Sequence, residues 1–85
     1  MAKGSLNIIG PQVRRLRTAV GLSQSALAGV CQRSGWDISR DSVAKIEAGL
    51  RWVCDWELLE LSKALRCAVV ELYPAKDQVA VRGRK

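Results

Sequence analysis

Three glycines divide the middle of this chain into short segments of helical periodicity. Gly21, Gly35 and Gly49 each follow a segment in which apolar residues recur three and four positions apart, a spacing that places them on one face of an α-helix. Glycine readily takes the left-handed backbone conformation that ends helices. The pattern therefore predicts an all-α fold built from short helices.

The boundaries of these helices follow from residues that favour helix starts. Pro11 suits a first helical turn, and Ser23 and Ser39 are good N-caps. Ile38 and Val43 have the spacing of a hydrophobic staple around the start of a helix. We expect five helices, at about 11–20, 24–34, 40–48, from about 55, and at about 69–73.

The length of the chain permits one domain. With 85 residues, it has little room for a deep substrate cleft beside its core. We assign residues 1–10 to an N-terminal arm and residues 11–74 to a compact domain. Residues 75–85 are charged and lack periodicity, so we expect a flexible basic tail there.

The charge is unevenly distributed. The net charge is +6, residues 1–36 contain no acid, and all eight carboxylates lie between Asp37 and Asp77. Basic clusters near both ends favour a polyanionic partner. Charged surface residues that merely keep the protein soluble would explain the net charge equally well.

Composition also argues against several classes of protein. Cys31, Cys54 and Cys67 are scattered and the chain has no histidine, so we expect no metal site, no cofactor, and free thiols in a reducing cytosol. We find no secretory signal and no membrane span, and we expect a cytoplasmic, nucleoid-associated protein. Catalytic motifs are missing, so we expect no enzymatic activity.

The motifs together resemble the Cro/repressor-type helix-turn-helix domains, the XRE family, over about 60 of the 85 residues. The matching pattern comprises Val13-x-x-Leu16-Arg17, Gly21-Leu22-Ser23-Gln24, Leu27-Ala28, Ile38-Ser39, Val43-x-x-Ile46-Glu47-x-Gly49, Leu58, Leu61, Ala64-Leu65 and Leu72-Tyr73.

This resemblance implies a compact five-helix, repressor-like domain in which the helices at 24–34 and 40–48 form the helix-turn-helix. The helix at 40–48 would then be the recognition helix in the major groove of DNA.

The sequence departs from the family pattern in two respects. Nine residues separate Ala28 from Ile38, where the family commonly has four. Ala68 replaces the usual Ser or Thr cap of the last helix, a loss of about 1 kcal/mol.

Four residues of the expected recognition helix are candidates for reading bases. Arg40 suits guanine, because arginine donates two hydrogen bonds to O6 and N7; the alternative is an exposed solubilising residue. Asp41 would accept from cytosine N4 or stabilise the helix dipole. Lys45 would reach a base or a phosphate, or simply be solvated. Ala44 is placed to contact a thymine methyl group.

Other residues are candidates for phosphate contacts. The resemblance implies that Gln24, at the start of its helix, binds a phosphate, and that Arg51 lies in a loop on the DNA backbone. Ser39 and Ser42 flank the same surface. For each of them, an ordinary polar surface residue is the alternative.

Two charged residues are expected to be structural. The resemblance implies that Arg17 and Glu47 form a buried or half-buried ion pair between the first and third helices. Trp36, Trp52 and Trp56 are irregularly spaced, so we expect packing in the core or at its rim rather than a base-stacking platform. Trp56 or the last helix is also a candidate for a dimer contact.

These observations favour sequence-specific binding of duplex DNA by a small transcriptional regulator, acting as a homodimer on a palindrome. A protein-interaction module such as an antitoxin, with DNA binding secondary, is the alternative, because the same fold serves both functions.

Overall fold

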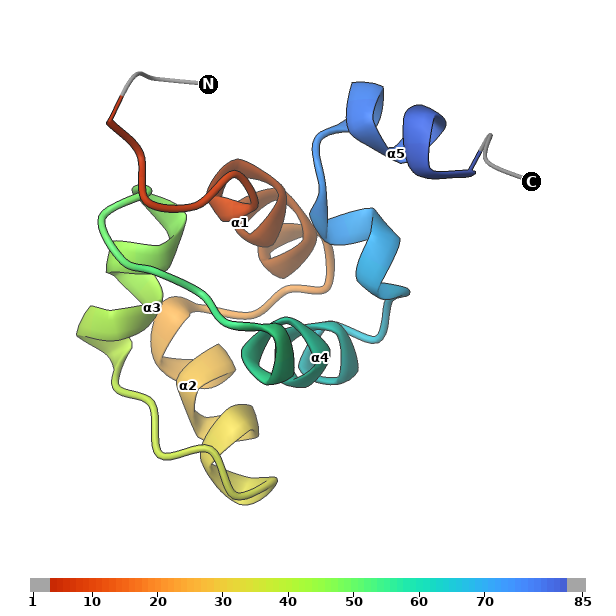
Figure 1. The fold of residues 1–85 in the computed structure, drawn as a ribbon. Coiled ribbons are helices and arrows are strands. Elements are labelled where there is room, and N and C mark those ends of the chain that lie inside the picture. Colours follow the sequence, from red (N-terminus) through yellow and green to blue (C-terminus); the bar gives the residue numbers. More distant parts are fainter. Residues whose placement is uncertain (1–3, 83–85) are drawn as a thin grey trace.

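The computed structural model describes residues 4–82, and in this range the fold is all-α, as the periodicity predicted. It consists of α1 (Gly10–Ala19), α2 (Gln24–Arg33), α3 (Arg40–Glu47), α4 (Asp55–Ala64), the 3-10 helix η1 (Val69–Leu72) and α5 (Ala75–Arg82), shown in Figure 1. None of these helices is long and apolar enough to cross a membrane.

The starts of α2 and α3 are fixed by serine caps. The Ser23 hydroxyl accepts a hydrogen bond from the backbone N–H of Ala26, and the Ser39 hydroxyl accepts one from that of Ser42. These bonds satisfy N–H groups that a helix start otherwise leaves unpaired. Ile38 and Val43, the expected staple around the start of α3, are both buried.

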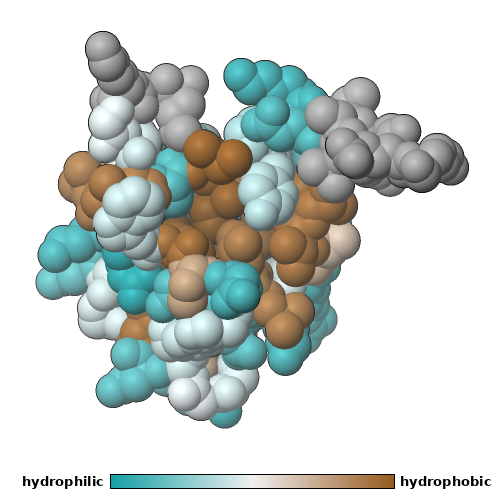
Figure 2. Space-filling model, viewed as in Figure 1, coloured by the Kyte–Doolittle hydropathy of each residue, from teal (hydrophilic) through white to brown (hydrophobic). Residues whose placement is uncertain are grey.

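The core is aliphatic and lies between α1, α2, α3, α4 and η1. Its largest fully buried side chains come from all five of these elements: Val13, Leu27, Cys31, Val43, Ile46, Leu61, Leu65 and Leu72. Figure 2 shows hydrophobic residues gathered at the centre of one face, over α1 and α4. Burial of these apolar surfaces holds together helices of only eight to ten residues.

The segment before α1 differs from the expected N-terminal arm. The backbone N–H of Leu6 donates to the carbonyl of Gly49 at 2.8 Å, and Ile9 is buried in the core. In the structure the packed domain therefore begins before residue 10. Residues 1–3 of the expected arm lie outside the described residues.

Asn7 joins this segment to two others. Its side-chain Nδ2 donates to the carbonyls of Ile46 at 3.0 Å and Arg51 at 2.9 Å. Its Oδ1 accepts from the backbone N–H groups of Ile9 and Gly10. One amide thus connects the start of α1, the end of α3 and the loop that follows α3.

The C-terminal part differs from the expected flexible tail, because residues 75–82 form helix α5. The carbonyl of Pro74 accepts from the N–H groups of Asp77 and Gln78, and the Gln78 side chain donates to the carbonyl of Tyr73 at 2.8 Å. Periodicity did not predict this helix, because α5 has no apolar stripe along one face. Residues 83–85 lie outside the described range.

The short helix expected at about 69–73 is a 3-10 helix at Val69–Leu72. Ala68 offers no side-chain oxygen, but the Glu71 carboxylate accepts from the backbone N–H of Ala68 at 2.8 Å. This bond is one half of a capping box. It compensates in part for the missing serine or threonine.

The close contact between α1 and α3 generates a prediction about Gly10. A Cβ atom at this position would lie 2.5 Å from the carbonyl oxygen of Ile46 and 2.6 Å from that of Glu47. Both are backbone atoms, so the helices would have to separate. We expect Gly10→Ala to destabilise the fold by about 1–3 kcal/mol in urea unfolding.

Gly29 provides the matched control, since it lies within α2 and the nearest atom to its added Cβ would be the end of the Arg33 side chain at 3.6 Å. Gly29→Ala should stabilise the fold by about 0.5–1 kcal/mol. Equal effects of the two substitutions would contradict this account of Gly10.

Candidate nucleic-acid interface

The outward face of α3 is polar and largely exposed. The side chains of Arg40 and Asp41 are 60% and 79% exposed, and Lys45 is also exposed. Ser42 and Ala44 are half-buried, while Val43 and Ile46 fill the core. The four residues predicted to read bases therefore lie on one short helix, and three of them are charged.

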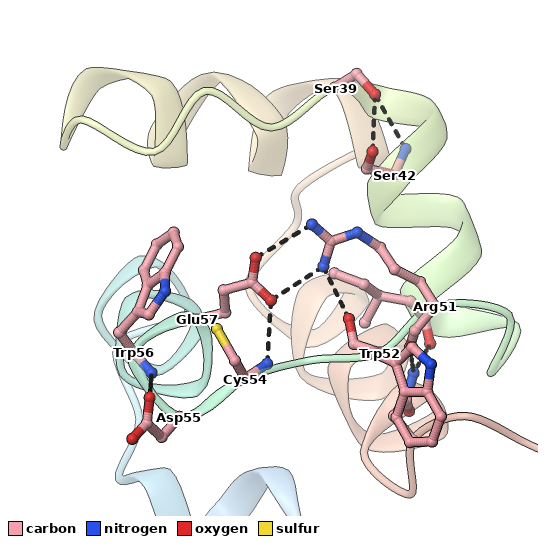
Figure 3. Close-up of polar contacts among 10 residues, drawn as sticks. Ser39, Ser42, Arg51, Trp52, Cys54, Asp55, Trp56 and Glu57 are labelled. Carbon is pink, nitrogen blue, oxygen red and sulfur yellow. Dashed lines mark hydrogen bonds and ion pairs between the residues drawn. The ribbon is translucent and has the colours of Figure 1, made fainter.

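The cap of α3 belongs to the same surface. The Ser39 hydroxyl lies 3.1 Å from the Ser42 backbone nitrogen and 3.2 Å from its hydroxyl (Figure 3). Both serines thus stabilise the start of α3. Arg40 and Asp41 are the first two residues of the helix, and their side chains form an ion pair at 3.3 Å. This ion pair is weak because both side chains are exposed to solvent.

Glu47 holds α1 and α2 against α3. Its carboxylate accepts from Arg17 Nε at 2.6 Å and from Arg17 Nη2 at 3.1 Å, while Gln24 Nε2 donates to it at 3.1 Å. A third Arg17 bond reaches the carbonyl of Leu22 at 2.8 Å. The hydrogen bonds that Arg17 donates to the Glu47 carboxylate raise the pKa of Arg17, despite the opposing effect of burial.

This arrangement determines where Gln24 points. Its side-chain amide nitrogen, predicted to bind a phosphate, is directed toward Glu47, and the residue is half-buried. Gln24 nevertheless lies at the first position of α2, where backbone N–H groups and the helix dipole favour an anion.

Arg51 is held by a second ion pair. Its guanidinium lies 3.0 and 3.1 Å from the two carboxylate oxygens of Glu57 and donates to the carbonyl of Trp52 (Figure 3). Its side chain is 29% exposed and that of Glu57 is 10% exposed. Arg51 therefore occupies a fixed position at the edge of the α3 surface.

Glu57 is the structural residue that sequence reasoning missed. It is the third residue of α4, and its carboxylate accepts from the backbone N–H of Cys54 at 3.1 Å. A glutamate three residues after an N-cap is the signature of a capping box. The cysteine at the cap position, in place of serine or threonine, concealed this signal.

The three tryptophans have different environments. Trp36 is 7% exposed and packs edge-on against Trp56, with ring centroids 5.5 Å apart. Trp56 is 51% exposed, in agreement with packing at the rim. Trp52 differs from the prediction, since it is 72% exposed. Figure 3 shows Trp52 and Trp56 on opposite sides of the Arg51–Glu57 pair.

The comparison with known proteins establishes the family. A model of the helix-turn-helix domain matches residues 8–72. The chain belongs to the helix-turn-helix family. The resemblance seen in the sequence is thereby confirmed at the level of this family.

Two solved structures support the same fold. The restriction-modification controller protein C.AhdI from Aeromonas hydrophila is 37% identical, with a TM-score of 0.68 over 76% of this chain and 87% of that chain. The DNA-binding domain of BldD is 28% identical, with a TM-score of 0.69 over 87% of this chain and all of that chain. No curated protein sequence matches the chain. The prediction of a repressor-like, all-helical domain is confirmed.

The Arg17–Glu47 pair generates a stability prediction. The side chains are 11% and 5% exposed, so removal of one charge leaves the other buried without its partner. We expect Arg17→Ala to lower the free energy of unfolding by about 3–5 kcal/mol. Arg14→Ala, on the exposed side of the same helix, should change it by no more than about 0.5 kcal/mol. An Arg17 variant with an unchanged melting temperature would contradict a structural role.

The Arg51–Glu57 pair generates a pH prediction. Burial raises the pKa of Glu57, but hydrogen bonds from Arg51 and the Cys54 backbone outweigh it, and the net pKa lies below the ordinary 4.5. The carboxylate therefore stabilises the fold fully above pH 4.5 and loses this effect as the pH falls through its lowered value. Urea unfolding should show wild type more stable than Glu57→Gln at neutral pH, with the difference closing in acid.

The variant Arg51→Gln provides the control for this titration. Because it lacks the cation, its stability should depend less steeply on pH in the acidic range. A gap between wild type and Glu57→Gln that stays constant with pH would contradict the proposed titration.

Proposed function

We propose that this chain is a small transcriptional regulator that binds duplex DNA sequence-specifically, with α3 in the major groove. The observation that carries the proposal is the exposed polar face of α3, on which Arg40 and Lys45 are uncovered by the rest of the described chain. The names of the two similar structures, a controller protein and a DNA-binding domain, support the same function.

Base reading is proposed for Arg40, Asp41, Ala44 and Lys45. The guanidinium of Arg40 matches the paired acceptors O6 and N7 of guanine, and the carboxylate of Asp41 matches the N4 donor of cytosine. The contact between these two side chains is exposed and long, at 3.3 Å. It therefore breaks at little cost when DNA offers better partners.

Phosphate binding is proposed for the residues that surround α3: Gln24, Ser39, Ser42 and Arg51. Contacts of this kind fix the register of the protein on the duplex and carry no sequence information directly. Glu57 holds Arg51 in place before any DNA arrives, which reduces the entropy lost on binding. The carboxylate also offsets part of the charge of Arg51, so its phosphate contact should be weaker than that of a free arginine.

The selectivity and salt dependence of binding test this proposal. Sequences selected from random duplex DNA should be bound more weakly by Arg40→Ala, by about 1–3 kcal/mol, with relaxed preference at one base pair. Lys45→Ala should weaken binding, and if it contacts a phosphate it should reduce the slope of log affinity against log salt by about 1.

Lys63→Gln is the matched control, because Lys63 is 61% exposed at the far end of α4 and its loss should leave DNA affinity unchanged. Binding that is insensitive to salt, or unaffected by Arg40→Ala, would contradict the proposal. Such a result would favour the alternative of a protein-interaction module such as an antitoxin.

We also propose that the regulator is a homodimer on palindromic DNA, with half-sites one helical turn, roughly 34 Å, apart. Trp56 and Leu59 support this, because they lie three residues apart on α4 and are 51% and 47% exposed. Exposed apolar residues on one helix face favour association.

Sedimentation equilibrium tests the dimer surface. Leu59→Ser should weaken dimerisation by about tenfold, since two buried leucines are lost per dimer. Leu50→Ser, at a more exposed leucine outside α4, is the control and should have no effect. A monomer at every concentration would contradict the homodimer.

A further inference from the structure

A second surface lies away from α3. A cleft of about 540 Å³ opens where α2 meets α4 and the end of α1. No residue of α3 or of the loop after it lines this cleft. The elements that border it, α2, α4 and the end of α1, can be followed in Figure 1, and α3 packs against α1 and α2.

The floor of the cleft is aliphatic. It includes Val20, Leu22 and Val30, none of which is fully buried, and Val20 is 49% exposed. These side chains lie next to the core but are not covered by it. An apolar floor of this kind favours the burial of apolar side chains from a partner.

The rim of the cleft is basic. Arg33, Lys63 and Arg66 line it, and no acidic residue does. Within residues 4–78, Arg33 and Arg66 form no ion pair. Lys63 has one contact of 3.5 Å with Glu60, and its side chain is 61% exposed. Three exposed cations around an apolar floor are complementary to an acidic, amphipathic ligand.

Helix electrostatics account for part of this rim. Arg33 and Lys63 lie in the last turns of α2 and α4, where a cation stabilises the negative end of the helix dipole. Arg66, which directly follows the C-cap of α4, lies close enough to the same helix end to share this effect.

Arg66 has an unfavourable backbone conformation for its residue type. Its φ is +56°, in the left-handed region, and it ends α4 with bonds from its own N–H to the Lys63 carbonyl and from the Cys67 N–H to the Ser62 carbonyl. This is the Schellman motif, in which glycine is preferred.

The other three helix ends of this kind use glycine. Gly21, Gly35 and Gly49 occupy the equivalent positions after α1, α2 and α3, with φ of +79°, +101° and +76°. Among these four helix ends, only the end of α4 carries a side chain at this position, and Arg66 lines the cleft. A non-glycine residue costs energy in this conformation, so we infer that the Arg66 side chain has a role of its own.

We propose that this cleft binds an acidic, amphipathic segment of another protein. Aliphatic side chains of the segment would cover Val20, Leu22 and Val30, and its carboxylates would pair with the three cations. Since the cleft shares no residue with the α3 surface, the regulator would hold DNA and this partner at the same time.

Charge alone would also permit a nucleic acid at this site. The aliphatic floor argues against it, because phosphate contacts use polar and charged donors. DNA at the cleft is therefore a competing outcome that the experiment distinguishes.

Selection from a displayed library of random peptides against the full chain provides the test. Enriched peptides should combine acidic and aliphatic residues, and their addition should shift the amide NMR signals of Val20, Leu22 and Val30. The double variant Arg33→Ser/Arg66→Gly should bind the peptides about tenfold more weakly. Arg14→Ser, which removes a cation from the exposed face of α1, should bind them like wild type.

Arg66→Gly alone separates a role in binding from a role in folding. It should keep or raise the melting temperature, because glycine is preferred at this position, while it weakens peptide binding. DNA affinity should be unchanged in both variants, so failure of this proposal is distinguishable from failure of the DNA-binding proposal. Three results would overturn the cleft proposal. The enriched peptides would lack acidic residues, the double variant would bind the peptides as tightly as wild type does, or the double variant would lose affinity for DNA.

Discussion

The Glu47 carboxylate is the group on which the geometry of this domain most depends. It lies at the last position of α3 and accepts hydrogen bonds from Arg17 in α1 and Gln24 in α2. A buried carboxylate is costly unless it is paired and hydrogen-bonded. Here the partners come from two helices, so satisfaction of the charge requires α1 and α2 to hold fixed positions beside α3. The polar interior therefore defines the orientation of the helix that we propose to enter DNA.

Much of the fold follows from local sequence features. Ser23 and Ser39 cap α2 and α3 as expected, and the buried stripes of Val13, Leu27 and Val43 reveal the helices to which they belong. These signals depend on residues close in sequence, where spacing alone determines which side chains share a face. For the same reason the exposed residues of α3 could be named in advance.

The features that the sequence did not reveal depend on distant contacts or lack a pattern. Asn7 bonds to carbonyls 39 and 44 residues away, and no spacing rule anticipates such a connection. Helix α5 has no apolar stripe. The capping box of Glu57 was not recognised because a cysteine occupies the N-cap position, where serine or threonine is usual. The exposure of Trp52 was also not predicted. Large aromatic side chains are usually well buried, but the residue type alone does not determine the burial of a particular tryptophan.

The side-chain amide of Asn7 also determines where the domain must begin when it is truncated or fused to another protein. A shortened chain that began at the first residue of α1 would leave the carbonyls of Ile46 and Arg51 without their donor, and it would lose the bond from Leu6 to Gly49. These groups border the C-terminal end of α3. Transplantation of the domain into a chimaeric regulator therefore calls for a junction upstream of Leu6, even though the regular helices begin only at Gly10.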